Sequence, residues 1–504
     1  MSKQPNILFI MSDDHAANAI SAYGSKINST PNIDRIANDG MKLDHCYVTN
    51  SICTPSRAAI LTGTHNHINR VTTLNTHIDN RLPNVAKHLK QGGYQTAMVG
   101  KWHLGTGPKH CPTGFDYWSV LPGQGIYHKP VFHEMGEVKT EEGYVTDIIT
   151  DKCLNWLDKR DTEKPFFLMC HHKAPHRPFD PKPEHRQLYN NMDIPIPETF
   201  DDDYANRAKA AAEAKMRISE DLSYVDLDLV KLPEHTGKTS CGNSQSVPFP
   251  KDLTNFYLRC ALTGEKFTFK TQDELKKWKY QRYIRKYLQT VHSIDENVGR
   301  MLDYLDENNL TENTIVIYTS DQGFYLGEHG WFDKRFIYEE SFQMPFLIKY
   351  PKEIKAGSVN KDMTCNVDFA PTWLDYAGLK TPNYMQGESF RNNLQGNTPK
   401  DWTDVAYHRY WMNQDDCHNA YAHYGIRTDK YKLIYWYNED LGEDGARPAD
   451  FEEKEWELFD LEKDPLELFN VYNDPAYSDI IKETTEKLNA KMLAIGDIPE
   501  HELV

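Results

Sequence analysis

Apolar runs of strand length alternate with amphipathic stretches of helix length up to about residue 380. The run Asn6 to Ser12 (N-I-L-F-I-M-S) is almost wholly apolar, which is typical of a strand buried on both faces of a sheet. Further strands are predicted at Gln95 to Val99, Pro165 to Cys170, Thr314 to Ser320 and Phe346 to Tyr350. Helices are predicted at Pro31 to Gly40, Leu82 to Gly92, Tyr144 to Lys159 and about Lys277 to Asn308. This alternation predicts an α/β domain with a large, mostly parallel sheet sandwiched by helices.

Residues 181 to about 275 depart from this rhythm. They are rich in Pro, Asp, Lys and Ala, lack strong strand patterns and include the loop Gly237 to Pro250. We therefore expect an insertion on the rim of the sheet that is helical in part.

The pattern changes again after about residue 395. Tyr424 to Tyr437 predicts a β-hairpin with its turn at residues 428–430. A strand is predicted at Trp456 to Leu461 and a closing helix at Ile480 to Ile495. Because a chain of 504 residues exceeds what one hydrophobic core usually supports, two domains are expected. We assign the α/β domain to residues 1–395 and a smaller C-terminal α+β domain to residues 396–504.

The composition excludes several classes of protein. The 57 basic and 74 acidic side chains give a net charge of −17, which argues against nucleic-acid binding because phosphate contacts need a basic surface. The net negative charge is still compatible with a small anionic substrate, since a local cluster of Lys, Arg and His can make the potential at one site positive. The nine scattered cysteines predict neither a disulfide framework nor a zinc site, and most are expected to be buried thiols.

The sequence contains no run of about 18 apolar residues, so no membrane span is predicted. The N-terminal segment Met1 to Gln4 enters a predicted strand by about Asn6, which leaves no room for the apolar region of a signal peptide. As the sequence stands, a cytoplasmic protein is expected. A periplasmic location would require that a leader had been removed.

Polar side chains follow four of the predicted strands at the point where each strand ends. They are Asp13-Asp14, Lys101-Trp102-His103, the run His171, His172, Lys173 and His176, and Asp321-Gln322. In open α/β sheets, ligands bind beyond the carboxyl ends of the strands. Four strand ends that carry acids, amides and bases therefore predict one polar site at this edge of the sheet.

Asp13, Asp14, Asp321 and Gln322 are all oxygen donors. Three carboxylates and an amide oxygen suit a hard cation, Ca²⁺ or less favourably Mg²⁺, better than zinc, which prefers His and Cys. The alternative for Asp13-Asp14, taken alone, is a purely structural role as a cap between the strand and the following loop. A second pair of oxygen donors at the end of another strand makes that alternative the weaker one.

The segment Cys53-Thr54-Pro55-Ser56-Arg57 is followed by Leu61-Thr62-Gly63. Thr54 is predicted to cap a helix and Pro55 to fit its first turn, which would put Cys53 and Arg57 at the positive end of a helix dipole. The pattern C-x-P-S-R-x-x-x-L-T-G resembles the signature of the type I sulfatases, a family of the alkaline phosphatase superfamily. In that family the cysteine is oxidised by a maturase to formylglycine, whose hydrate is the nucleophile.

The resemblance implies a role for each residue of the predicted site. The matching family positions hold calcium through Asp13, Asp14, Asp321, Gln322 and the formylglycine at Cys53, although the usual last ligand is Asn rather than Gln. By the same match, Arg57 supports the nucleophile, and Lys101, His176 and Lys334 bind the sulfate oxygens. His176, together with Lys334, would protonate the leaving alcohol, and His103 would deprotonate the second hydroxyl so that sulfate is expelled.

Asp333 and Arg335 flank Lys334. This Asp-Lys-Arg triplet resembles the bacterial carbohydrate sulfatases that act on N-acetylglucosamine 6-sulfate, because an acid beside a planar cation can bind two ring hydroxyls. His408 and Arg409 are candidates for the far wall of the pocket; packing at the domain interface is the alternative for this segment. The predicted substrate is thus a sulfated carbohydrate, a class that includes the glycosaminoglycans.

Two rival functions fit parts of the pattern. A phosphonate or phosphate ester hydrolase of the same superfamily can use a similar metal site and the same modified cysteine. A catalytically silent binder of sulfated glycans is a rival of another class, and the complete set Cys53, Arg57, Lys101, His103, His176 and Lys334 argues against it. The leading hypothesis is a sulfuric ester hydrolase.

Overall fold

The computed structural model describes residues 4–235, 244–448 and 453–502 and centres on a ten-stranded sheet. Parallel strands form its middle, in the order β11 (Thr314–Ser320), β1 (Asn6–Asp13), β8 (Phe166–Pro175), β4 (Gln95–Lys101) and β5 (Tyr117–Leu121). The flanks are β14 (Phe346–Lys349), β2 (Met41–Leu43) and β15 (Ser358–Asn360) beyond β11, and β6 (Val131–Glu134) and β7 (Glu137–Thr140) beyond β5. Because β14 and β6 pair antiparallel with their neighbours, the sheet is parallel at its centre and mixed at its edges. The predicted α/β fold is confirmed.

The register of the central strands brings their carboxyl ends to one edge. Ser12 at the end of β1 lies opposite Ser320 at the end of β11. On the other side of β1, the pairing with β8 shifts register before Asp13, which lies opposite Pro175. β8 thus continues past Cys170, where the sequence predicted its end, and carries its polar run further toward the same edge.

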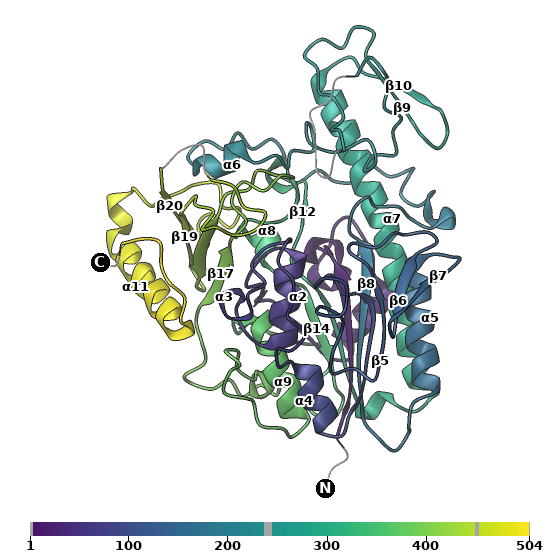
Figure 1. Cartoon of the computed structure of the whole chain (residues 1–504). Helices are drawn as coiled ribbons and strands as arrows, with labels where there is room; N and C mark the ends of the chain where they lie inside the picture. The colour runs from purple at the N-terminus through teal and green to yellow at the C-terminus, as the bar shows by residue number, and fades with distance from the viewer. Residues whose placement is uncertain (1–3, 236–243, 449–452, 503–504) are drawn as a thin grey trace.

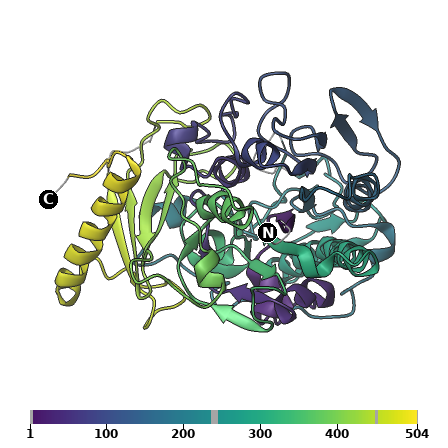
Figure 2. The same ribbon diagram turned by 90° about the horizontal axis from the view of Figure 1, so that it is seen from below.

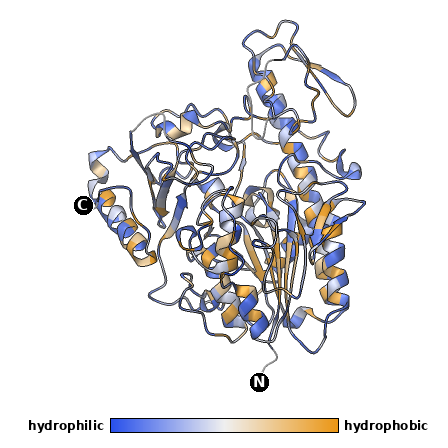
Figure 3. Ribbon diagram, in the orientation of Figure 1, coloured by the Kyte–Doolittle hydropathy of each residue, from blue (hydrophilic) through white to orange (hydrophobic). Residues whose placement is uncertain are grey.

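Helices cover both faces of the sheet (Figures 1 and 2). On one face lie α1 (Pro31–Asn38), α5 (Val145–Asp158) and α7 (Gln272–Glu307), and on the other lie α2 (Cys53–Thr62), α4 (Val85–Gln91) and α9 (Phe369–Tyr376). Successive residues of β1 alternate between the two cores, with Phe9 in one and Ile10 in the other. Figure 3 shows the result as apolar strands enclosed by the two helical layers. A sheet buried on both faces leaves its ends as the place for polar chemistry.

Helix α7 connects the outer surface with the polar edge of the sheet. It begins at Gln272, earlier than predicted, because the side chain of Thr271 accepts a hydrogen bond from the backbone N–H of Glu274 and caps the helix. Near its middle, the hydroxyl of Tyr287 donates to the backbone carbonyl of Asp14 at 2.7 Å. The helix therefore supports the loop that follows β1.

The region between β8 and α7 contains little regular structure. Its elements are the short helices η3 (Pro183–His185) and α6 (Lys209–Glu213) and the hairpin of β9 (Tyr257–Arg259) and β10 (Lys266–Thr268). The hairpin stands at the top of Figure 1, beside the start of α7. Residues 237–243 of the predicted loop Gly237 to Pro250 lie outside the described residues.

A second, four-stranded antiparallel sheet forms the C-terminal part. Its strands are β17 (Ala406–Tyr410), β18 (His423–Arg427), β19 (Tyr431–Trp436) and β20 (Glu455–Asp460), and α11 (Ser478–Ile495) packs against it (Figure 1). The predicted hairpin is confirmed, with residues 428–430 between β18 and β19. The domain boundary after residue 395 stays a prediction.

Two further expectations concern cysteines and the membrane. Seven described cysteines carry free thiols, and all but Cys111 are buried, as predicted for most of them. Cys417, by contrast, is disulfide-bonded, which its scattered spacing did not predict. Among the helices of the described residues, none combines the length and the apolar character needed to cross a bilayer.

Candidate active site

Cys53 is the first residue of α2, and its side chain is only 1% exposed. The predicted capping role of Thr54 is wrong. Ile52 occupies the N-cap position without a side-chain cap, and the Thr54 hydroxyl instead lies 3.1 Å from His103 Nδ1. The uncapped helix start leaves backbone N–H groups and the positive end of the helix dipole beside Cys53, a setting that favours an anion there.

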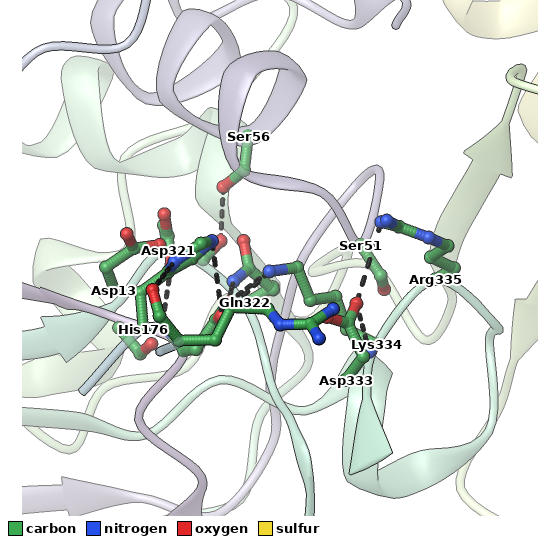
Figure 4. A network of polar contacts seen from close by, with 12 residues as sticks. Asp13, Ser51, Ser56, His176, Asp321, Gln322, Asp333, Lys334 and Arg335 are labelled. Carbon is green, nitrogen blue, oxygen red and sulfur yellow. Dashed lines mark hydrogen bonds and ion pairs between the residues drawn. The ribbon is translucent and has the colours of Figure 1, made fainter. Parts of the chain in front are cut away.

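The acidic residues after β1 and β11 meet because these two strands are paired in register. The backbone N–H of Asp14 donates to Asp321 Oδ1 at 3.2 Å, and the amide nitrogen of Gln322 donates to Asp14 Oδ1. Figure 4 shows Asp13, Asp321 and Gln322 gathered below α2, from which Ser56 points down to the Asp321 backbone. The four predicted oxygen donors therefore converge on one buried point.

Two oxygens of this cluster have no hydrogen-bond partner among the described residues, although both are buried. They are Asp13 Oδ1 and Gln322 Oε1. Ligand atoms of Asp13, Asp14 and His176 also lie within 4.8 Å of one another. Buried oxygens normally find a partner, so unpaired oxygens that converge on one point fit a bound hard cation. The residues present thus fit the metal that the family uses.

The pKa values of the carboxyl groups point the same way. Burial raises the pKa of Asp321 to about 7, with the charge of Asp13 adding to the effect. Burial also raises the pKa of Asp14 well above its usual range, although Lys334 opposes the shift. Asp13 differs, since Lys101, His176 and Arg57 outweigh the effect of its burial and hold its pKa well below normal. A cation bound among them would stabilise the ionised form of all three.

Three cationic side chains surround these acids. Arg57 donates from Nε to Asp321 Oδ2 and from Nη1 to the backbone carbonyl of Lys101, while Nη2 forms an ion pair with Asp321 Oδ2. The Lys101 ammonium contacts Asp13 and also Gln124 Oε1. The Lys334 ammonium lies 2.6 and 2.8 Å from the two carboxylate oxygens of Asp14. Burial would lower the pKa of Lys334, but Asp14 and Asp333 raise it, so this side chain stays charged.

Both predicted histidines belong to the cluster. His176 Nε2 lies 3.8 Å from Asp14 Oδ2, while its Nδ1 lies 2.8 Å from the Arg177 carbonyl, which fixes the ring. Burial lowers the pKa of His176 and of His103 well below the usual value. Both imidazoles are therefore neutral at pH 7 until a further anion enters the site.

Asp333 and Arg335 lie beside Lys334 on a strained backbone segment, with φ angles of 75° and 115°. Arg335 Nε is 3.5 Å from Asp415 and Nη1 is 3.7 Å from Asp333, yet neither nitrogen makes a hydrogen bond to a described residue. His418 Nε2 lies 3.3 Å from Asp333 Oδ2. Strain and unpaired buried donors next to the reacting groups indicate a place for a polar ligand.

The structure does not bring His408 and Arg409 into this group. His408 Nε2 accepts a hydrogen bond from the Ser51 backbone at 3.0 Å, and the histidine is fully buried. Arg409 forms ion pairs at 2.8 Å with Asp497 and with Glu500 of the C-terminal segment. His408 thus packs between the two parts of the chain, as the alternative predicted, whereas the side chain of Arg409 forms its ion pairs within the C-terminal part.

Three residues that the sequence did not single out also line the site, together with Lys173 from the predicted polar run. Gln124 contacts Lys101, His418 contacts Asp333, and Lys173 lies among the charged groups, where burial lowers its pKa to about 7. Arg177 pairs with Asp226 and keeps Nη1 unpaired by any described residue. Lys173 and Arg177 adjoin His176 in sequence, so that proximity was an available signal. Gln124 and His418 come from loops, where no periodicity marks a residue.

Comparisons with known proteins agree with this geometry. The family model described as Sulfatase matches residues 5–379, and the model described as N-sulphoglucosamine sulphohydrolase, C-terminal, matches residues 327–493. An N-acetylglucosamine-6-O-sulfatase of Bacteroides thetaiotaomicron is 44% identical over 500 residues, which cover 97% of this chain and 86% of that protein. An arylsulfatase of Clostridium perfringens is 25% identical and covers 95% of this chain and 92% of its own length.

A solved structure with D-glucosamine-2-N,6-O-disulfate, described as its substrate, is also similar. It is 42% identical, has a TM-score of 0.85, and the match covers 99% of this chain and 100% of that one. The sulfatase model spans most of the sequence, and it includes the helix start at Cys53 and both strand ends that carry the acids. This chain belongs to the sulfatase family.

Proposed function

We propose that this sulfatase hydrolyses the 6-O-sulfate ester of N-acetylglucosamine or N-sulfated glucosamine. The observation that carries the proposal is the segment Asp333-Lys334-Arg335. It places a carboxylate and a guanidinium with unpaired donors directly beside the ammonium of the reaction site. These groups suit the vicinal hydroxyls of a glucosamine ring. The similar N-acetylglucosamine-6-O-sulfatase and the similar structure that holds a glucosamine disulfate support this sugar.

We propose Ca²⁺ as the metal, held by Asp13, Asp14, Asp321 and Gln322, and formylglycine, made from Cys53 by a maturase, as the nucleophile. When bound, the ion would stabilise negative charge on the formylglycine hydrate and on the sulfate. Oxygen ligands favour Ca²⁺ over zinc. The unpaired oxygens of Asp13 and Gln322 support this assignment.

Each of the surrounding side chains then has its own role in the reaction. Arg57, fixed by Asp321, orients the modified residue, and the ammonium groups of Lys101 and Lys334 bind sulfate oxygens. The incoming sulfate raises the pKa of the neutral His176, which takes up a proton and transfers it to the departing sugar oxygen as the S–O bond breaks. One hydroxyl oxygen of the formylglycine hydrate would bond to sulfur as the bond between sulfur and the sugar oxygen breaks. His103 would then accept the proton of the other hydroxyl, so that the C–O bond to sulfate breaks, the aldehyde re-forms and a water molecule restores the hydrate.

A substrate panel tests this proposal. The enzyme, matured with its formylglycine, is offered the 6-sulfates of N-acetylglucosamine, N-sulfoglucosamine and N-acetylgalactosamine, together with 4-nitrophenyl sulfate and a phosphonate monoester. The highest kcat/KM is expected for a glucosamine 6-sulfate. Higher turnover of the phosphonate would favour the rival esterase, and preference for the galactosamine ester would overturn the sugar assignment.

Mass spectrometry of the peptide containing Cys53 tests the nucleophile. Protein from the native host is expected to carry a peptide lighter than the cysteine form, as oxidation to the aldehyde requires. A Cys53→Ala variant serves as the inactive control. Complete absence of the modification in active enzyme would contradict the mechanism, while absence in a native protein without turnover would favour a glycan binder.

A further inference from the structure

A cluster of two histidines and a glutamate lies on the outer side of α7, away from the residues of the active site. His292 and Glu296 are one turn apart on the helix, and His185 comes from the short helix η3. One ligand atom from each lies within 4.8 Å of the other two. His185 is buried, whereas His292 and Glu296 are partly exposed, so the cluster opens to solvent.

The distances within the cluster fit the edges of a metal tetrahedron. Glu296 Oε1 lies 3.2 Å from His185 Nε2 and 3.6 Å from His292 Nε2. For zinc bonds of about 2.0–2.1 Å, adjacent ligand atoms of a tetrahedral site are about 3.3 Å apart. The two imidazole rings are nearly perpendicular, at 89°, with centroids 4.7 Å apart, so they do not stack on each other. Both nitrogens instead point at the same carboxylate oxygen.

Neighbouring side chains hold two of the three groups, His185 and Glu296, in ligating positions. Ser293 Oγ lies 2.9 Å from His185 Nδ1, which leaves Nε2 for the shared point. The Lys182 ammonium lies 3.1 Å from Glu296 Oε2 and 2.9 Å from Asp147 Oδ2, which leaves Glu296 Oε1 for the same point. Contacts that fix the remote atom of each ligand are the usual support of metal-binding histidines and carboxylates.

An ordinary ion-pair cluster is the competing interpretation. It accounts for His185 Nε2, which can donate a hydrogen bond to Glu296 Oε1, but it leaves His292 Nε2 at 3.6 Å from the same oxygen without a hydrogen bond to it, and the carboxylate already pairs with Lys182. Burial lowers the pKa of His185, which favours the neutral ring that a metal needs. Two imidazole nitrogens and one carboxylate oxygen match zinc far better than calcium.

We propose that His185, His292 and Glu296 form a second metal site, which binds one Zn²⁺ with water at the open position. This site is separate from the catalytic calcium site and does not depend on the proposed substrate. It would link η3 to α7, and η3 follows the segment that carries His176. Its role is to hold that segment against the helix. It stabilises the fold and supplies no chemistry to sulfate hydrolysis.

Metal titration of the full chain tests the site. Protein freed of metal with a chelator and returned to saturating Ca²⁺ is titrated with Zn²⁺ in a calorimeter, and with Co²⁺ in a spectrophotometer. We expect one Zn²⁺ per chain, the visible absorption of tetrahedral Co²⁺, and a thermal midpoint that rises with Zn²⁺. Because Ca²⁺ saturates the catalytic site during the titration, Zn²⁺ that binds under these conditions binds at another site.

Three variants separate this site from others. His292→Ala and Glu296→Gln are expected to lower Zn²⁺ affinity at least tenfold and to abolish the Co²⁺ absorption and the thermal shift. His133→Ala, a partly buried histidine on β6, should bind as the unmodified chain does. Equal binding by all four proteins, or no binding by the unmodified chain, would overturn the proposal. Retained sulfatase activity in His292→Ala would show that the variant is folded.

Discussion

Arg57 approaches a single carboxylate oxygen of Asp321 with two nitrogens: Nε donates a hydrogen bond to Oδ2 at 3.0 Å, and Nη2 forms an ion pair with the same oxygen at 2.8 Å. Both residues are buried beside Cys53. The third contact of the guanidinium, 2.7 Å from Nη1 to the Lys101 carbonyl, fixes its plane. The pair thus connects the helix start with the metal-binding acid by geometry as well as charge.

Arg57→Lys keeps the charge but loses this fork. We expect kcat/KM for the preferred sugar sulfate to fall by about 10²–10³, the cost of removing a positioned donor. The measurement is steady-state kinetics on fully matured enzyme. Arg81→Lys, which alters an exposed pair with Asp79, is the control and should leave turnover unchanged. Near-normal turnover in Arg57→Lys would show that charge alone suffices.

Gln322 provides a test of the metal site, because its amide nitrogen faces Asp14 while its oxygen is unpaired by any described residue. Gln322→Leu has a similar size and removes the oxygen, so Ca²⁺ affinity should fall at least tenfold in calorimetry. Gln322→Asn retains an amide oxygen at a shorter reach and is expected to bind within about tenfold of the unmodified chain. If the leucine variant binds Ca²⁺ normally, Gln322 is not a ligand.

The proposed proton transfer from His176 predicts a dependence on the leaving group. A sugar alcohol needs a proton to depart, whereas 4-nitrophenolate departs without one. His176→Ala should therefore lower kcat about 10²–10⁴-fold on the sugar sulfate and less than tenfold on 4-nitrophenyl sulfate. His45→Ala, at a distant half-buried histidine, is the control. Equal losses on both substrates would assign His176 to sulfate binding alone.

The meeting of Asp13, Lys101 and Asp321 was predictable because strand ends in a parallel sheet share one edge, whereas Cys53, Arg57 and Lys334 were predicted from the resemblance to the sulfatase signature. The apolar runs of β1 and β11 locate Asp13 and Asp321 without any knowledge of side-chain contacts. Arg409 illustrates the limit of this reasoning. A charged residue on a strand of the smaller sheet can face either side of that sheet. Arg409 pairs with Asp497, which is so far away in the sequence that no local pattern could predict the contact.

Helix capping was predictable only where the local pattern was unambiguous. The sequence Thr-Pro after Cys53 suggested a cap at Thr54, yet the helix begins at Cys53 because the active site, not the solvent, surrounds its first turn. Similarly, His418 reaches Asp333 from a loop of the C-terminal part. Such contacts depend on how two parts of the chain pack, which periodicity does not encode.

Lys432, on β19 of the C-terminal sheet, is a buried connection between that sheet and helix α8 (Glu339–Phe342). Its ammonium lies 2.9 Å from Glu339 on α8 and 2.6 Å from Glu467. Lys432→Met leaves the buried Glu467 without its cation and leaves Glu339 with Arg427 as its remaining cation, so the free energy of unfolding should fall by about 3–5 kcal/mol. Lys430→Met, at an exposed pair with Glu462, should change it by less than about 1 kcal/mol. Urea unfolding measures both, and similar effects would contradict the argument.

The same connection predicts how stability depends on pH. Burial would raise the pKa of Glu339, but Lys432 and Arg427 lower it from 4.5 to about 2. Because the pKa of Glu339 is lower in the folded than in the unfolded chain, its ionisation stabilises the fold. This stabilisation is complete above pH 4.5 and is lost as the pH falls toward 2, since the unfolded chain takes up the proton first. Glu339→Gln lacks this contribution. The difference in unfolding free energy between the unmodified chain and Glu339→Gln should stay constant from pH 8 to pH 6 and narrow below about pH 4.5. A difference that widens in acid would show that Glu339 is protonated in the folded protein.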